Sequence, residues 1–285
     1  MSQINEQILP PRINLPSLEK NVLELRALKD FFLTGLVWGL AILASIPLVS
    51  VIYMLIMEGG ARLDFEAITA LPPAGFETGG GFGNAIVGTL TMVGIASALS
   101  IPIGTMAALY LAILNPNSKT ATVSRFLAKV LTGFPSILAG VFVYAVIVIT
   151  TGTYSAWAGG VALAVLMLPT VTLAAEEAMK QVPQRMKDAA FGMGCTRTQV
   201  IFKVVLPTAL PGIMTGVILA VAGAAGESAP LLFTALFSNY YMSELAEPTA
   251  SLSILIYNFS GMPFENQIEL AWTASLALVL LVLFF

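Results

Sequence analysis

Six long apolar segments are the feature that most restricts how this chain can fold. Each is near the ~20 residues that an α-helix needs to cross a bilayer. Hydrophobic residues make up 57% of the chain and charged residues only 10%, whereas a soluble domain carries about 25% charged residues. A water-soluble fold would have too little polar surface, so the sequence predicts an all-α integral membrane protein. The predicted spans are 31–57, 84–114, 126–150, 157–175, 208–238 and 269–285, all in one transmembrane domain over 31–285.

The last two spans differ from the others. Pro211, Glu227 and Pro230 interrupt the fifth span, so we expect it to bend or to be followed by a re-entrant piece. The sixth span is short and ends without basic residues, so we expect the natural protein to run a little further.

The first 30 residues carry a different pattern. They contain no short apolar core followed by a small-residue cleavage site, so they are not predicted to be a signal peptide. Leu18, Val22, Leu25 and Lys29 have helical spacing, which favours an amphipathic cytoplasmic helix lying on the membrane surface. A frayed tail is the alternative.

The basic residues predict the orientation. If the N-terminus is inside, segments 1–30, 115–125 and 176–207 with their flanks hold every Lys and Arg except Arg62. Cytoplasmic loops carry such an excess of positive charge. We therefore expect both termini to be cytoplasmic in a multi-pass protein of the plasma (inner) membrane.

Several functional classes are disfavoured. The chain has no histidine and one cysteine, Cys195, which removes the commonest general base, the commonest metal ligand and any internal disulfide. The glycine run 79–83 lacks the lysine of a nucleotide-binding loop, so we expect it to turn the chain at the membrane entrance. No catalytic residue, metal site or nucleic-acid partner is predicted.

The cytoplasmic loop 176–207 carries the clearest local signals. Pro183 suits the start of a helix, and Gly194 suits the residue just after a helix end, where a positive φ is needed. Thr196 and Gln199 have the spacing of a capping box, and Pro207 is placed to stop the second helix. The loop is therefore predicted to form a short helix, a tight turn and another helix.

The first of these helices has an apolar stripe at i, i+3, i+4 and i+7. It consists of Met186, Ala189, Ala190 and Met193. A cytosolic helix needs such a stripe only if something covers it. The cover is either the chain's own helices or the groove of a partner, and the pattern alone leaves both open.

This loop resembles that of ABC-importer permeases. Their motif is Glu-Ala-Ala, three residues, Gly, nine residues, Ile, one residue and Leu-Pro. The chain has Asp188-Ala189-Ala190, then Gly194, Val204 and Leu206-Pro207 at the same spacings. The resemblance implies that 183–200 is a coupling element docked on an ATPase subunit. The residues it implies for coupling are Arg185, Met186, Asp188, Ala189, Ala190, Phe191, Met193 and Gly194.

A wider resemblance narrows the family. Segments 80–89, 133–137, 176–178, 226–235 and 256–258 are similar to those of A-type permease subunits of phosphate-specific ABC transporters. The resemblance implies a six-helix type I bundle that imports inorganic phosphate. It also implies a heterodimer with a C-type permease, two ATPase copies that bind ATP and Mg, and an outer phosphate-binding protein. No cofactor is implied for this chain.

Members of that family often carry two membrane arginines where this chain has Leu173 and Gly223. The cation for phosphate would then come from the partner subunit, or backbone N–H groups at broken helices would serve instead. Glu227 is either a gate or pathway residue, or a helix-end acid in the headgroup layer. The other polar side chains either line the path or are packing residues. The candidates for the path are Ser136, Thr170, Thr172, Glu227, Ser228, Tyr257 and Asn258.

Three rival functions follow from the same sequence. One is an ABC-importer permease for sulfate, molybdate or an organic solute. A second is a secondary transporter or channel that works without an ATPase. The third is an intramembrane enzyme, which the missing histidines and the lack of paired membrane acids disfavour.

Overall fold

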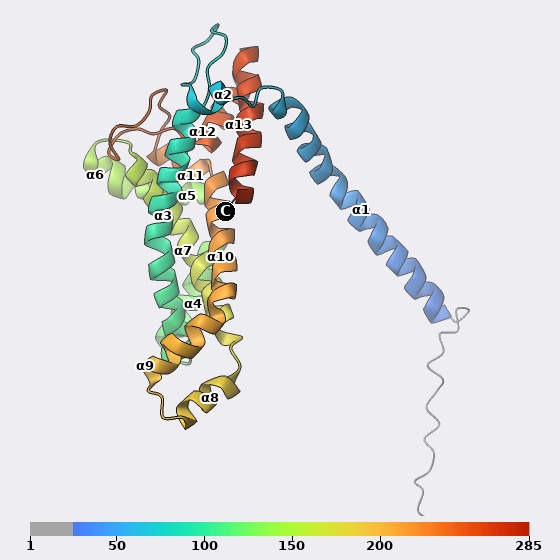
Figure 1. Ribbon diagram of the computed structural model, residues 1–285, viewed down its shortest axis with the longest axis vertical. Helices are drawn as coiled ribbons and strands as arrows, with labels where there is room; N and C mark the ends of the chain where they lie inside the picture. The colour runs from blue at the N-terminus through green and yellow to red at the C-terminus, as the bar shows by residue number, and fades with distance from the viewer. Residues whose placement is uncertain (1–24, 285) are drawn as a thin grey trace, which may run out of the picture. The chain divides into compact units, whose positions relative to one another are not determined.

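The computed structural model describes residues 25–284, and every regular element in that range is helical (Figure 1). Most of the predicted N-terminal amphipathic segment, residues 1–24, lies outside the described residues. The chain divides into two units, one ending at Tyr53 and one beginning at Met54. Helix α1, Leu25–Gly60, contains this boundary and is a candidate membrane span by its length and composition.

In the described part of the chain, five helical segments are long and apolar enough to cross a membrane. Two of them consist of more than one helical piece. The π-helix η1 (Tyr110–Leu114) extends α3, and α9 (Arg197–Val200) and the π-helix η3 (Ile201–Val205) lead into α10. The long helices are α1, α3 (Gly83–Leu109), α7 (Ala156–Lys180), α10 (Leu206–Gly226) and α13 (Glu265–Phe284). The count of candidate spans is six if a bent pair is included.

That bent pair occupies the predicted third span, 126–150. Helix α4, Lys119–Thr132, and the segment Ser136–Thr151 differ in direction by 105°. The second segment consists of α5 (Ser136–Val143), the π-helix η2 (Tyr144–Val148) and α6 (Ile149–Thr151). The structure thus differs from an uninterrupted third span. Pro135 explains the break, because proline has no backbone N–H and disfavours a helical conformation of the residue before it.

The predicted fifth span is also broken, as its Glu227 and Pro230 indicate. Helix α10 ends at Gly226, Glu227 is extended with ψ 123°, and the short helix α11 runs over Ala229–Thr234. Pro211 lies inside α10 without ending it. The prediction that Pro207 stops the helix opened at Thr196 is wrong, because Arg197–Gly226 is one helical segment. Pro207 lies in the first turn of α10, directly after η3, where the hydrogen-bond pattern already changes and a proline is tolerated.

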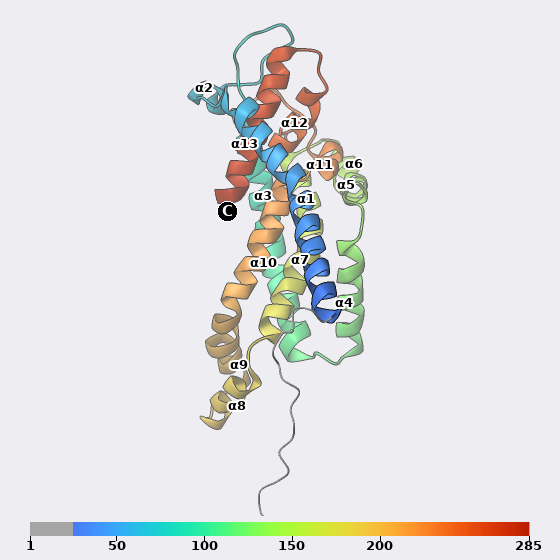
Figure 2. The same cartoon turned by 90° about the vertical axis from the view of Figure 1, so that its right-hand side faces the viewer.

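Helix α7 is the centre of the second unit. It packs against α3 on one side and α10 on another, and the three helices lie side by side (Figures 1 and 2). Small residues allow the close approach: Gly104 of α3 faces Val171, and Gly216 of α10 faces Ala174. The shared core brings together apolar side chains of all three helices.

The two ends of this helical layer carry different elements. Helices α8 (Gln184–Gly192) and α9 lie at one end (Figure 1). At the other end lie α2 (Phe65–Thr69) and α12 (Leu252–Ser260), with a second core cluster around Phe82, Leu255 and Leu270.

Candidate functional site

Helix α8 begins at Gln184, directly after Pro183, as the sequence predicts within one residue. The Gln184 amide donates a hydrogen bond of 2.8 Å to the Asp188 carboxylate, one turn along the helix. Such i,i+4 pairs support a short exposed helix.

The turn that ends α8 has the predicted geometry. Gly194 has a φ of +82°, which side chains disfavour. Its N–H donates to the Phe191 carbonyl at 2.9 Å, and the Cys195 N–H donates to the Ala190 carbonyl at 3.1 Å. These two bonds form a Schellman motif. The predicted capping box then opens α9, because Thr196 and Gln199 each bond the other's backbone N–H.

Within residues 25–284, the bundle covers the apolar stripe at one position. Ala190 is 2% exposed and belongs to the shared core, with Val182 and Val205. Met186 is 43% exposed and Met193 is 78% exposed. Ala189, Phe191 and the charged residues Arg185 and Asp188 are exposed too. Ala190 thus attaches α8 to the bundle, while the larger apolar side chains project outward.

A group of charged residues that the sequence analysis did not single out lies beside this turn. Arg197, the first residue of α9, donates to the carbonyls of Ile113 and Leu114 at 2.9 and 2.7 Å. Arg125 of α4 reaches the carboxylate of Glu176 at 2.5 Å. A recognisable signal was present in Glu176, an acid in an apolar span with Lys180 four residues later.

The predicted path residues lie on several elements. Ser136 opens α5, Glu227 ends α10, and Ser228 precedes α11. Helix α5 packs against α11, so these three residues come from the ends of neighbouring elements. The Ser253 hydroxyl, which the sequence analysis missed, donates to the Glu227 carbonyl at 2.9 Å.

The other path candidates are not gathered there. Thr170 and Thr172 lie within α7, and the Thr172 hydroxyl bonds the Leu168 carbonyl of its own helix at 2.7 Å. Tyr257 and Asn258 lie in the last turns of α12, where Tyr257 is exposed and Asn258 is half-buried. Thr172 is therefore bonded as a packing residue would be.

The positions of the two family arginines carry no cation. Leu173 is half-buried in α7, and Gly223 is exposed in α10. Among residues 25–284, no three His, Cys, Asp or Glu side chains are grouped as a metal site requires.

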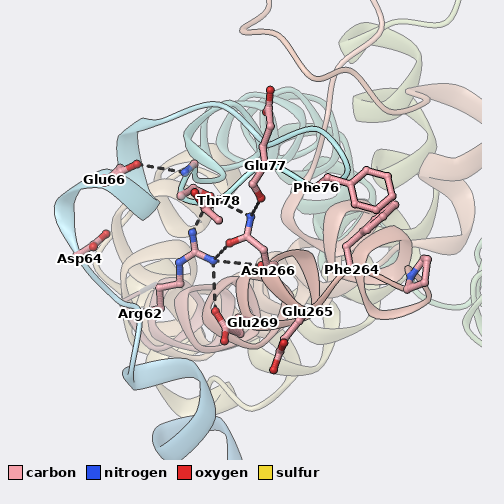
Figure 3. Close-up of a pocket in the computed structure, with 13 residues that line it drawn as sticks. Arg62, Asp64, Glu66, Phe76, Glu77, Thr78, Phe264, Glu265, Asn266 and Glu269 are labelled. Carbon is pink, nitrogen blue, oxygen red and sulfur yellow. Dashed lines mark hydrogen bonds and ion pairs between the residues drawn. The ribbon is translucent and has the colours of Figure 1, made fainter.

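A pocket of about 700 Å³ lies at the end of the bundle opposite α8 (Figure 3). Arg62 is its central cation and bonds the Gly79 carbonyl at 2.6 Å and the Asn266 side chain. Gly79 and Gly80 both have positive φ, in agreement with a tight turn of the glycine run. Five acidic residues line the pocket with the arginine, of which Glu269 pairs with it at 3.5 Å, and none of the path candidates lines the pocket. The acids are Asp64, Glu66, Glu77, Glu265 and Glu269.

Comparison with known proteins places this geometry in context. Residues 100–285 match the family model described as binding-protein-dependent transport system inner membrane component. The chain is 38% identical over 262 residues to the probable phosphate transport system permease protein PstA of Methanocaldococcus jannaschii, with 91% of each chain covered. It is 38% identical over 233 residues to the phosphate transport system permease protein PstA of Haemophilus influenzae, with 82% of each covered.

A solved structure has a similar fold. The inward-facing MetNI methionine ABC transporter matches with a TM-score of 0.57 at 22% identity. The match covers 71% of this chain and 90% of that chain.

Proposed function

Because the chain belongs to the family of binding-protein-dependent transport system inner membrane components, we propose that it is the permease subunit of an ATP-driven importer of inorganic phosphate. The names of the two relatives support phosphate as the substrate, since they share 38% identity with this chain over most of its length. The proposed partners are a C-type permease, two ATPase subunits that bind ATP and Mg, and an outer phosphate-binding protein.

The observation that carries this proposal is the exposed face of α8. Met186, Phe191 and Met193 are between 43% and 78% exposed, on α8 or directly after it. This helix also carries three charged residues and lies outside the candidate spans. Apolar side chains presented from a fixed helix to water favour insertion into a groove of another protein. We assign the ATPase subunit as that protein and the α8 end as cytoplasmic, because the basic residues cluster there.

The proposed cycle follows from this placement. ATP closes the two ATPase subunits and moves α8, and this movement turns the permease pair from inward-open to outward-open. The loaded binding protein docks on the acidic outer end, which holds Asp64, Glu66 and Glu77. Phosphate then enters a cavity between the permeases, and hydrolysis resets the pair. Coupling requires that the ATPase contact α8 differently in the two states.

The phosphate path is proposed to pass the broken helices. Ser136, Glu227 and Ser228 lie at the ends of α5, α10 and α11, where a helix break frees backbone groups. Thr170, Thr172, Tyr257 and Asn258 complete the proposed path. Since Leu173 and Gly223 supply no cation, backbone N–H groups or the partner permease are proposed to neutralise the anion.

Reconstitution tests the substrate and the energy source together. The complete complex is placed in liposomes with the binding protein outside and ATP inside. Uptake of labelled phosphate is compared with that of sulfate and molybdate. We expect phosphate uptake that requires both ATP and the ATPase subunits. Uptake without the ATPase would indicate a secondary transporter or channel, and preferred uptake of another anion would reassign the substrate.

A second experiment tests the α8 contact. The double variant Met186→Glu, Met193→Glu places charge on the exposed face and should stop the ATPase subunits from co-purifying with the permease. Asn117→Glu is the matched control, because Asn117 is exposed and lies outside the 183–200 element. Normal co-purification of the double variant would contradict this placement of the ATPase.

A further inference from the structure

We propose that Arg197 and Arg125 are positioning residues at the end of the α3–η1 helix: Arg197 holds it to the α8 turn and Arg125 holds it to α4 and α7, so that these parts move as one body during transport. The inference rests on the proposed function, because it specifies how the movement of α8 reaches a second membrane span. We call the two guanidinium groups, together with the carbonyls of Leu111, Ile113 and Leu114, the arginine latch.

The latch involves the backbone carbonyl groups at the end of the α3–η1 helix. The last carbonyl groups of a helix have no partner within it. The Asn115 N–H satisfies the Tyr110 carbonyl at 3.0 Å. Side chains from elsewhere satisfy the carbonyls of Leu111, Ile113 and Leu114. The end of this helix is therefore held by other elements.

Arg197 supplies the first connection. It lies three residues after Gly194 and is the first residue of α9, so it follows any movement of the α8 turn. Its Nη2 donates to both Ile113 and Leu114, 84 and 83 residues earlier in the chain. A cation at a helix N-terminus is unfavourable to that helix, whereas a cation at a C-terminus is favourable. The Arg197 side chain thus stabilises the C-terminus of η1 and does not stabilise α9, the helix to which it belongs.

Arg125 supplies the second connection. Its Nη2 donates to the Leu111 carbonyl at 2.6 Å, and its Nη1 donates to the Pro116 carbonyl at 2.9 Å. Its Nε contacts the Glu176 carboxylate, which is 2% exposed and also accepts from Lys180 at 2.6 Å. All three guanidinium nitrogens are engaged, which ties α4 and α7 to the same helix end.

Three routes therefore lead from α8 into the membrane. Two are covalent, because α7 leads into α8 through residues 181–183, and α9 and η3 continue into α10. The third is the latch, which brings α3 along with α10. Without Arg197 the covalent routes still move α7 and α10, but the end of α3 loses its bonds to α9 and is held at its last carbonyls by Arg125 alone. Loss of the latch should reduce the phosphate moved per ATP without weakening the hold of the ATPase on α8.

The test uses the full complex with two spin labels, on Asn117→Cys and Thr198→Cys, in a Cys195→Ser background. Both label positions are exposed and flank the latch. In the otherwise unchanged chain, we expect the label distance to stay the same between the nucleotide-free and ATP-bound states. In Arg197→Ala, the distance should shift or broaden with ATP, and phosphate uptake per ATP should fall by about fivefold or more.

Two further variants separate positioning from folding. Lys203→Ala removes a positive charge from the neighbouring η3. The Lys203 ammonium makes no hydrogen bond or salt bridge to residues 25–284, so the label distance and the phosphate uptake per ATP should match the wild type. Arg197→Lys keeps the charge but not the planar donor group, and should give intermediate values. If the complex with Arg197→Ala does not assemble, the same two measurements are made on Arg197→Lys.

The result that would overturn the latch is an Arg197 variant with an unchanged label distance in both states and wild-type uptake per ATP. Failure of the proposed function looks different, because the wild-type complex would then take up no phosphate. In that case the label distances alone decide for or against the latch.

Discussion

Gly140 lies so close to Pro230 that a side chain would collide with the Pro230 backbone: a Cβ atom on Gly140 would be 2.6 Å from the Pro230 Cα atom and 2.8 Å from its carbonyl oxygen. Gly140 belongs to α5 and Pro230 to α11. The glycine thus lets the second halves of two broken spans pack backbone to backbone. This contact holds α5 across the bundle despite the 105° bend before it.

Gly140→Ala should separate these two helices. Overpacking costs about 1–3 kcal/mol, so the complex should unfold at a lower temperature and lose much of its phosphate uptake. Gly94→Ala in α3 is the control, because no heavy atom lies within 4 Å of its Cβ position. Equal melting temperatures and uptake for the two variants would show that the contact is unimportant.

Gly194→Val should uncouple ATP hydrolysis from transport while membrane insertion stays normal. Nothing lies within 4 Å of its Cβ position, so the effect comes from the backbone, whose φ is +82°. A left-handed conformation costs about 1–2 kcal/mol for residues with a side chain. Gly94→Val is the matched control, since Gly94 has equally open space and a helical backbone and lies outside the 183–200 element. ATPase activity and uptake are measured together, and normal uptake by Gly194→Val would count against the turn as coupling element.

Glu176→Gln should destabilise the complex by about 1–3 kcal/mol, because it removes the buried partner of Arg125 and Lys180, whose side chains are 22% and 43% exposed and keep part of their hydration. Glu176 holds both Arg125 and Lys180, and its side chain is 3% exposed. Glu177→Gln is the control on the next residue, which is exposed. Thermal unfolding of the two variants gives the comparison. The ion pairs would be shown to contribute little if both unfold alike.

Arg62→Met should loosen the outer loop that contains the glycine run. The Arg62 guanidinium bonds the Gly79 carbonyl and Asn266, and hydrogen bonds to charged groups contribute about 1.5–3 kcal/mol each. Limited proteolysis from the outer side should therefore cut residues 72–80 faster. Glu265→Gln, an exposed residue of the same pocket, should leave the cleavage rate unchanged. Equal rates for Arg62→Met and the wild type would contradict this role.

The local features of α8 could be predicted because their causes lie within a few residues of one another. The Schellman turn needs Gly194, and the capping box needs only Thr196 and Gln199. The long apolar segments likewise indicate candidate spans by composition alone. Such features depend on backbone conformation and solvent preference, which neighbouring residues decide.

Contacts between distant segments required the folded chain. The sequence around Arg197 does not indicate that its guanidinium group bonds carbonyls 84 and 83 residues away. An arginine side chain can donate equally well to water or to many other acceptors, so its partner depends on the folded structure. Pro135 indicates that a helix must break, but the direction of the next helix depends on the packing of Gly140 against Pro230. The exposure of Met186 and Met193 was decided in the same way, because only the assembled helices determine which face of α8 they cover.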